Sequence, residues 1–141
     1  MKKFIKKPQF FFIFLAILVL ITGLIHKEGA IKLALYGTYI DLKSWSVCLF
    51  SSFFFILIAV NYASLTITQK TPKKVLTILH IVLQIIALIP LLYYIYSSDA
   101  STSYDEVSRM NIILILAFTL FIIATIIHLI NFAASLLAKK D

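Results

Sequence analysis

FFFIFLAILVLITGLI, at residues 10–25, is the first of four long apolar runs, and the others lie at residues 45–67, 75–96 and 110–138. A helix needs about 20 apolar residues to cross the hydrocarbon core of a bilayer. The chain has 141 residues, is 62% hydrophobic and has a mean hydropathy of +1.02. A soluble domain of this size could not bury that much apolar surface. The sequence therefore predicts a single all-α membrane domain, an antiparallel bundle of four transmembrane helices.

The flanking residues indicate where these helices begin and end. Pro8 suits the first helical position, where a backbone N–H is not needed, and Gly29 is expected to cap the C-terminus of the first helix. The fourth run is long enough to tilt or to project beyond the bilayer. The expected helices are 8–28, 45–67, 75–96 and 110–138, with outer loops at 29–44 and 97–109 and an inner loop at 68–74.

Basic residues are distributed unevenly between the two sides of this bundle. Because Lys and Arg concentrate on the cytoplasmic side of membrane proteins, we expect a multi-pass protein of the cell membrane with both termini in the cytoplasm. The lysines there also attract anionic membrane lipids, and charges so close to the lipid make nucleic acid an implausible partner. The expected cytoplasmic residues are Lys2, Lys3, Lys6, Lys7, Lys70, Lys73, Lys74, Lys139 and Lys140, and the expected outer ones are Lys27, Lys32, Lys43 and Arg109.

The first outer loop contains the stretch IKLALYGTYIDLK at residues 31–43. Apolar and other residues alternate on both sides of Gly37-Thr38, which predicts a short β-hairpin with a two-residue turn. A short interfacial helix is the alternative. Because an isolated hairpin is marginal in water, its apolar face must lie on the bundle, the membrane surface or a partner. The residues expected to form an outer contact surface are Tyr36, Tyr39 and Trp45.

The predicted layout resembles that of the claudin family of tetraspan membrane proteins. Trp45-Ser46-Val47-Cys48 is similar to the W-x-x-C that ends the first-loop motif of that superfamily. The chain departs from the motif because Lys43 and Ser44 replace its Gly-Leu pair, a second cysteine is missing and the outer loop is short. The resemblance implies a tetraspan architecture, and architecture alone does not imply an activity.

Small and polar residues recur at steps of three and four along the predicted helices. Such residues mark the faces on which membrane helices approach one another closely. We therefore expect these faces to point into the bundle and the Leu, Ile and Phe side chains to face lipid. The residues are Ala16, Gly23, Ser52, Ala59, Ala63, Thr77, His80, Gln84, Ala87, Ala117, Phe121, Ala124, His128, Asn131, Ser135 and Ala138.

Five polar residues fall at similar depth in the expected cytoplasmic half: Asn61, His80, Gln84, His128 and Asn131. Polar groups inside a membrane are costly and often functional. One interpretation is an interhelical hydrogen-bond lock. The alternatives are a pocket for a lipid headgroup or a small polar ligand, and haem ligation by the two histidines.

Acidic residues are missing from all four apolar runs. A nucleophile–base–acid arrangement, a hydrolytic metal site and proton-coupled transport are therefore disfavoured. Cys48 is the one cysteine, so an intramolecular disulfide and a thiolate metal site are excluded.

These patterns do not indicate an enzyme or require a cofactor. We expect a non-catalytic protein that acts through contacts with a membrane-protein partner or with further copies of itself. It would be an accessory subunit, an immunity-type protein or a membrane organiser. The alternatives are a small transporter or lipid-binding protein and, less favoured, a haem-binding electron-transfer subunit.

Overall fold

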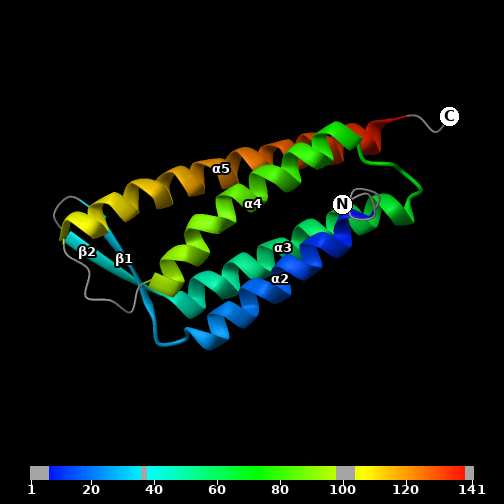
Figure 1. Ribbon diagram of the computed structural model, residues 1–141. Helices are drawn as coiled ribbons and strands as arrows, with labels where there is room; N and C mark the ends of the chain where they lie inside the picture. Colours follow the sequence, from blue (N-terminus) through cyan, green and yellow to red (C-terminus); the bar gives the residue numbers. More distant parts are fainter. Residues whose placement is uncertain (1–6, 36–37, 98–103, 139–141) are drawn as a thin grey trace.

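The computed structural model describes residues 7–35, 38–97 and 104–138. This part of the chain forms four helices and a two-stranded antiparallel sheet (Figure 1). All four helices are long and apolar enough to cross a membrane, as predicted, which indicates a multi-pass membrane protein. The elements are α2 (Pro8–Ile25), β1 (Ala30–Leu35), β2 (Thr38–Lys43), α3 (Ser44–Ile67), α4 (Lys74–Ser97) and α5 (Tyr104–Leu137).

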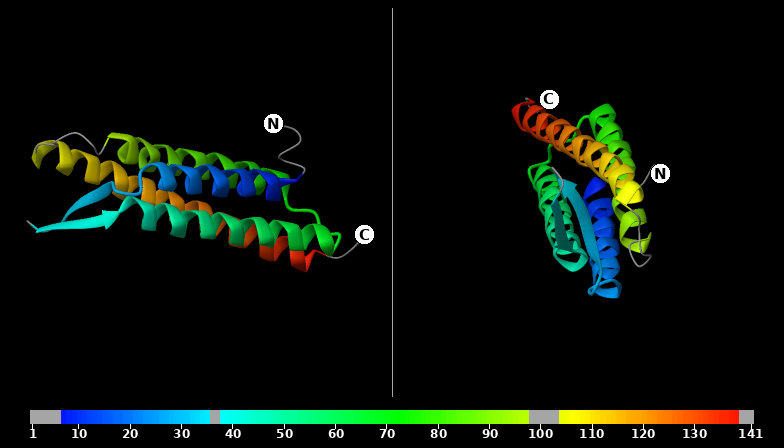
Figure 2. Two further views of the ribbon diagram at one scale, coloured as in Figure 1. Left: turned by 90° about the horizontal axis from the view of Figure 1, so that it is seen from below. Right: turned by 90° about the vertical axis from the view of Figure 1, so that its left-hand side faces the viewer.

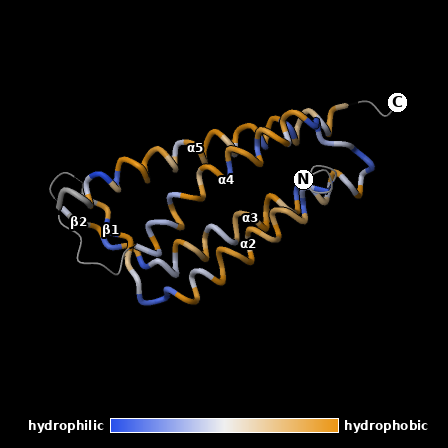
Figure 3. The backbone as a smooth tube through the Cα atoms, viewed as in Figure 1, coloured by the Kyte–Doolittle hydropathy of each residue, from blue (hydrophilic) through white to orange (hydrophobic). Residues whose placement is uncertain are grey.

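The bundle consists of two helix pairs, because α2 packs along α3 and α4 packs along α5. The α3–α4 connection at residues 68–73 lies at the same end as the start of α2 and the end of α5 (Figures 1 and 2). We call this the turn end and the opposite one, which carries β1 and β2, the hairpin end. Hydrophilic residues gather at these two ends, while hydrophobic residues cover the helices between them (Figure 3).

Small residues bring α2 and α3 close together. A Cβ atom added at Gly23 would lie 2.6 Å from Cys48 Cβ and 3.2 Å from Trp45 Cε3, so only glycine fits between the two helices. Nearer the turn end, the Ser52 hydroxyl donates to the carbonyl of Ala16 across the same interface, at 2.9 Å. These contacts and the burial of Ala59 confirm the inward faces predicted on the first two helices, except at Ala63, which is only half-buried.

The inward faces of α4 and α5 are also confirmed for most of their predicted residues. Ala138 is an exception because it is exposed just after the end of α5, and Phe121 is only half-buried. The predicted residues of these two helices that are buried are Thr77, His80, Gln84, Ala87, Ala117, Ala124, His128, Asn131 and Ser135.

The first helix ends earlier than predicted, at Ile25 rather than at residue 28. The chain turns at once, with the N–H of Gly29 donating to the carbonyl of His26. Gly29 does not adopt the left-handed conformation of a C-terminal cap. Its carbonyl instead accepts the N–H of Ser44, so this glycine closes the base of the hairpin.

The fourth helix begins earlier than predicted, at Tyr104 rather than at residue 110, and spans 34 residues. Part of the predicted outer loop is therefore helical. Two acidic residues in the first turn suit a helix N-terminus. The early turns of α5 also have a packing partner, because α5 contacts β1 and Val107 is only 3% exposed.

The predicted hairpin is present, but Thr38, which the sequence places in the turn, belongs to a strand. Leu35 pairs with Thr38, so Thr38 belongs to β2, and the residues between the strands lie outside the described part of the chain. Ile31 of β1 is buried at 3% exposure, whereas Ile40 and Leu42 of β2 are 44% and 40% exposed. The hairpin therefore packs on the bundle through β1 and leaves β2 open.

Candidate functional site

His80 of α4 and His128 of α5 lie face to face inside the half of the bundle nearest the turn end. Their ring centroids are 4.9 Å apart and their planes differ by 28°, and the two side chains are 0% and 1% exposed. Phe12 of α2 stacks on His80 at 4.7 Å, and the Tyr62 ring of α3 lies 4.8 Å from the ring of His128. All four helices therefore meet here. We call Phe12, Asn61, Tyr62, His80, Gln84 and His128 the histidine cluster.

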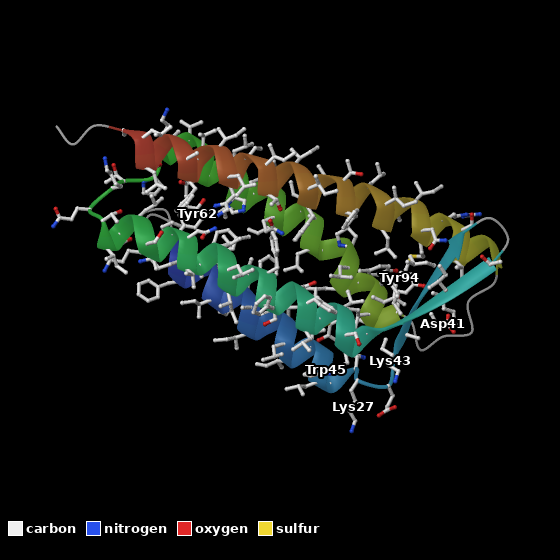
Figure 4. The ribbon with its side chains drawn as sticks, turned by 180° about the vertical axis from the view of Figure 1, so that it is seen from behind. Lys27, Asp41, Lys43, Trp45, Tyr62 and Tyr94 are labelled. Carbon is white, nitrogen blue, oxygen red and sulfur yellow. The ribbon has the colours of Figure 1, made fainter. Side chains whose placement is uncertain are left out.

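Each histidine is hydrogen-bonded to α3 through one ring nitrogen. The Tyr62 hydroxyl, which points into the bundle (Figure 4), lies 3.0 Å from His80 Nδ1. The Asn61 side chain places Nδ2 at 3.2 Å from His128 Nε2. Because a carboxamide nitrogen can only donate, His128 Nε2 accepts this bond. A neutral His128 therefore carries its proton on Nδ1.

The second asparagine of the predicted cluster, Asn131, has a different position and role. Its Oδ1 accepts the backbone N–H of Lys73 at 2.9 Å, and its Nδ2 donates to Thr77 Oγ1 at 3.0 Å. The N–H groups at the start of a helix lack intrahelical partners, so Asn131 satisfies one of them and fastens α5 to the beginning of α4. The Tyr62 hydroxyl lies near both Asn131 and Thr77, which joins this contact to the histidine cluster.

The α3–α4 connection is itself tightly folded. Gln69 adopts a left-handed conformation with φ of 57°. The N–H of Gln69 then bonds the carbonyl of Thr66, and the N–H of Lys70 bonds that of Leu65. This is the Schellman pattern of a helix C-terminus. The Lys70 ammonium also donates to the carbonyl of Ala138, so the connection is joined to the end of α5.

Four atoms of the histidine cluster are buried without a hydrogen-bond partner among the described residues. They are His80 Nε2, His128 Nδ1 and both polar atoms of the Gln84 amide. Gln84 is 0% exposed and follows His80 by one turn of α4, so its amide lies within side-chain hydrogen-bonding reach of the His80 ring although the two do not meet in good hydrogen-bond geometry. Some polar atoms of the cluster are therefore hydrogen-bonded within it, and the atoms that are not are all on side chains of α4 and α5.

The structure brings most of the predicted site residues together. Asn61, His80, Gln84 and His128 share one cluster, while Asn131 lies closer to the turn end, at the first turn of α4. Sequence reasoning missed Phe12 and Tyr62. A signal for Tyr62 was available, because its phenol directly follows Asn61 and is itself a polar group at membrane depth.

The stacked histidines do not have the arrangement that two axial haem ligands require. Ring-nitrogen lone pairs lie in the plane of the imidazole, so two nearly parallel rings direct them into separate planes and not at one iron between them. Each ring also uses one nitrogen to bind α3. In addition, no group of three or more His, Cys, Asp or Glu side chains that could hold a metal occurs within the described ranges.

The predicted outer contact surface is described only in part. Tyr36 and the side chain of Tyr39 lie outside the described residues. Trp45 is half-buried, and its ring lies over Gly23 of α2. The outer contact surface that the sequence predicts therefore stays a prediction.

Tyr94 of α4 holds the hairpin in place, a role that the sequence does not reveal. Its hydroxyl accepts the N–H of Lys32 at 3.0 Å and donates to the carbonyl of the same residue at 2.9 Å. Both backbone groups of Lys32 therefore point away from β2. Because Asp41 pairs with Lys32, its backbone groups also point away from the other strand, toward the open side of β2. Figure 4 shows Tyr94 beside the hairpin that carries Asp41.

Comparisons of the chain with protein-family models, with curated proteins and with solved structures found no match. A functional proposal consequently depends on the two ends of the bundle themselves.

Proposed function

We propose that the chain is a non-catalytic protein of the cell membrane that acts through contacts at its hairpin end. It binds another membrane protein or a second copy of itself, as an accessory subunit, an immunity-type protein or a membrane organiser. The observation that carries this proposal is the asymmetry of the hairpin, in which β1 is held by α4 and β2 is open.

The open strand has the features of a protein-binding edge. An exposed strand presents unpaired backbone donors and acceptors, to which an extended segment of a partner can add as a further strand. On β2 the backbone of Asp41 points to the open side, and the exposed Ile40 and Leu42 supply apolar contact. Tyr94 fixes β1, so the edge is held in one position before a partner arrives, which lowers the entropy lost on binding.

The distribution of charge supports an orientation with the hairpin outside the cell. The lysines of the turn end, Lys7, Lys70, Lys73 and Lys74, have no described acidic side chain beside them, whereas at the hairpin end Glu28 and Asp41 offset part of the positive charge of the basic residues there. Reporter domains fused to the C-terminus test this: a fluorescent reporter that folds only in the cytoplasm should be active, and a periplasmic or extracellular reporter inactive. The reverse pattern contradicts the orientation.

The histidine cluster supports the contact proposal indirectly. Within it, the bonds of His128 to Asn61 and of His80 to Tyr62 connect three helices, as expected for an interhelical lock. A ligand-binding or transport role is the second candidate, favoured by the partnerless atoms on His80, Gln84 and His128.

Site-specific photo-crosslinking in native membranes tests the proposed function. We expect a photoreactive residue at Leu42 to form adducts with one protein species, identified by mass spectrometry. The matched control is Leu79 of α4, which is 42% exposed but lies near the turn end, and there only lipid adducts are expected. Asp41→Pro removes an N–H on the open side and should abolish the Leu42 adduct. Lipid adducts alone at Leu42 contradict the proposal.

A further inference from the structure

We infer that the histidine cluster is a binding site for internal water, held between α4 and α5 by His80, Gln84 and His128. Three polar side chains converge there, all at most 1% exposed, and each has at least one buried atom without a protein partner. This inference is independent of the proposed contact function.

The protonation of His128 makes one of these atoms a donor. Since Nε2 accepts from Asn61, the partnerless Nδ1 bears the hydrogen. In the same way, if the Tyr62 hydroxyl donates to His80 Nδ1, the partnerless His80 Nε2 also bears a hydrogen. Buried donors in native proteins almost always have a protein or water partner. A membrane span has no bulk solvent to supply one, so the partner must be bound within the bundle.

Water matches the chemistry of the three side chains better than other ligands do. The Nδ1–H group of His128 requires an acceptor, Nε2 of His80 donates or accepts according to the direction of the Tyr62 bond, and the Gln84 amide offers both an acceptor and donors. Water can accept two hydrogen bonds and donate two, and buried waters typically make about three. A metal ion would instead need convergent lone pairs, which the stacked rings do not provide. A bound anion would face the Gln84 carbonyl oxygen unfavourably.

The three side chains are neighbours, because the His80 and His128 rings are in contact and Gln84 lies beside His80. The two imidazole rings are 4.9 Å apart. Gln84 lies four residues after His80, a spacing that places both side chains on the same face of a helix.

Bound water completes the hydrogen bonding among three helices. At the level of the cluster, Tyr62 links α3 to α4 and Asn61 links α3 to α5. A direct bond between α4 and α5 lies nearer the turn end, between Thr77 and Asn131. A water that bridges His80 or Gln84 to His128 supplies the third link. The two histidines then form a water-mediated contact between α4 and α5.

Solid-state NMR of the full chain in lipid bilayers tests the inference directly. The chain has three histidines, so ring-¹⁵N labelling gives few signals, and His26 at the hairpin end is an internal reference. We expect magnetisation to pass from water to the ring nitrogens of His80 and His128. Absence of this transfer, with His26 showing it, overturns the inference.

A substitution at Gln84 provides a second test with a defined sign. Gln84→Met keeps the side-chain length and removes the amide. If water occupies the site, the variant loses a hydrogen-bonding partner, so the thermal unfolding temperature falls and water transfer to His128 weakens. If the site is dry, the variant removes an unsatisfied buried amide, and the unfolding temperature rises. The matched control is Leu79→Met on the exposed face of α4, for which no shift is expected. Should Gln84→Met fail to fold, the NMR result on the unmodified chain decides.

Discussion

A tyrosine hydroxyl holds each end of this bundle, but the two tyrosines bind different kinds of group. At the turn end, Tyr62 contacts the His80 side chain in a buried network that involves three helices. At the hairpin end, Tyr94 binds the backbone of a single strand, and the other strand stays exposed. Removing a partner at the turn end leaves a buried polar group unsatisfied, whereas water can replace a lost bond at the hairpin. The turn end should therefore be the more sensitive of the two to loss of a hydrogen bond.

The largest expected effect on stability comes from a packing change at Gly23. This residue lies in the half of α2 nearest the hairpin end, so the change tests whether the turn end is the more sensitive of the two. Gly23→Leu places a side chain where even a Cβ would lie 2.6 Å from that of Cys48. Overpacking of this kind typically costs about 1–3 kcal/mol, and more where the backbone must move. We expect a large fall in the thermal stability of the detergent-solubilised protein.

A second substitution in the milder variant Gly23→Ala tests whether a clash with Cys48 causes the loss of stability. Gly23→Ala should be less harmful than Gly23→Leu, and adding Cys48→Gly should restore part of the lost stability because it removes the clashing atom. A double variant that is no more stable than Gly23→Ala alone shows that close α2–α3 approach is not the reason.

The second effect concerns the turn end. His128→Ala removes the acceptor of the Asn61 amide and a buried ring that packs against Tyr62 and His80. Truncation of a large buried side chain costs about 2–5 kcal/mol, and the lost membrane hydrogen bond adds about 0.6 kcal/mol. We expect the lower part of that range and a matching fall in thermal stability.

A double-mutant cycle separates packing from hydrogen bonding at this site. In the His128→Ala background, Asn61→Ala should cost less than in the unmodified chain, since its partner is already gone. Equal costs in both backgrounds would falsify the assigned bond. His80→Ala should behave like His128→Ala, because Tyr62 then loses its contact.

Tyr94→Phe should have a smaller effect, about 1 kcal/mol for loss of a hydroxyl with two backbone hydrogen bonds. Hydrogen–deuterium exchange at the Lys32 amide should accelerate, while exchange in α4 around His80 stays unchanged. Equal acceleration at both places contradicts the independence of the two ends. Tyr93→Phe is the matched control, because Tyr93 is 64% exposed on the same helix.

The sequence is sufficient to predict what depends on composition and periodicity. Spans that avoid charge, and small residues at steps of three and four, predicted the four helices and the faces buried between them. His80, Gln84 and His128 could be placed at one depth because each lies a known number of residues from the end of an apolar run. Depth along a helix follows from the rise per residue, so these expectations needed no tertiary information.

The remaining features depend on contacts between distant segments. Tyr94 lies on the inward face of its helix, seven residues after Ala87, but no local pattern gives its partner, because the position of β1 decides that its hydroxyl meets Lys32. The earlier start of α5 follows similarly from its contact with β1. Gly29 resembled a helix cap in sequence, but the bond between its carbonyl and the N–H of Ser44 serves the base of the hairpin.

The smallest effect on stability is expected at the open strand β2, which differs most from the buried turn end. Leu42 is 40% exposed, so Leu42→Thr should change the free energy of unfolding by no more than about 0.5 kcal/mol. Threonine keeps the β-propensity of the strand, and the hairpin should remain paired. Binding of the proposed partner should nevertheless weaken, because the substitution removes apolar contact from the edge that the partner would cover. Ile31→Thr on β1 is the matched control: it replaces a 3% exposed side chain and should destabilise the protein clearly. If Leu42→Thr destabilises as much as Ile31→Thr, β2 is packed in the membrane-embedded protein, and the hairpin end is closed in the same sense as the turn end.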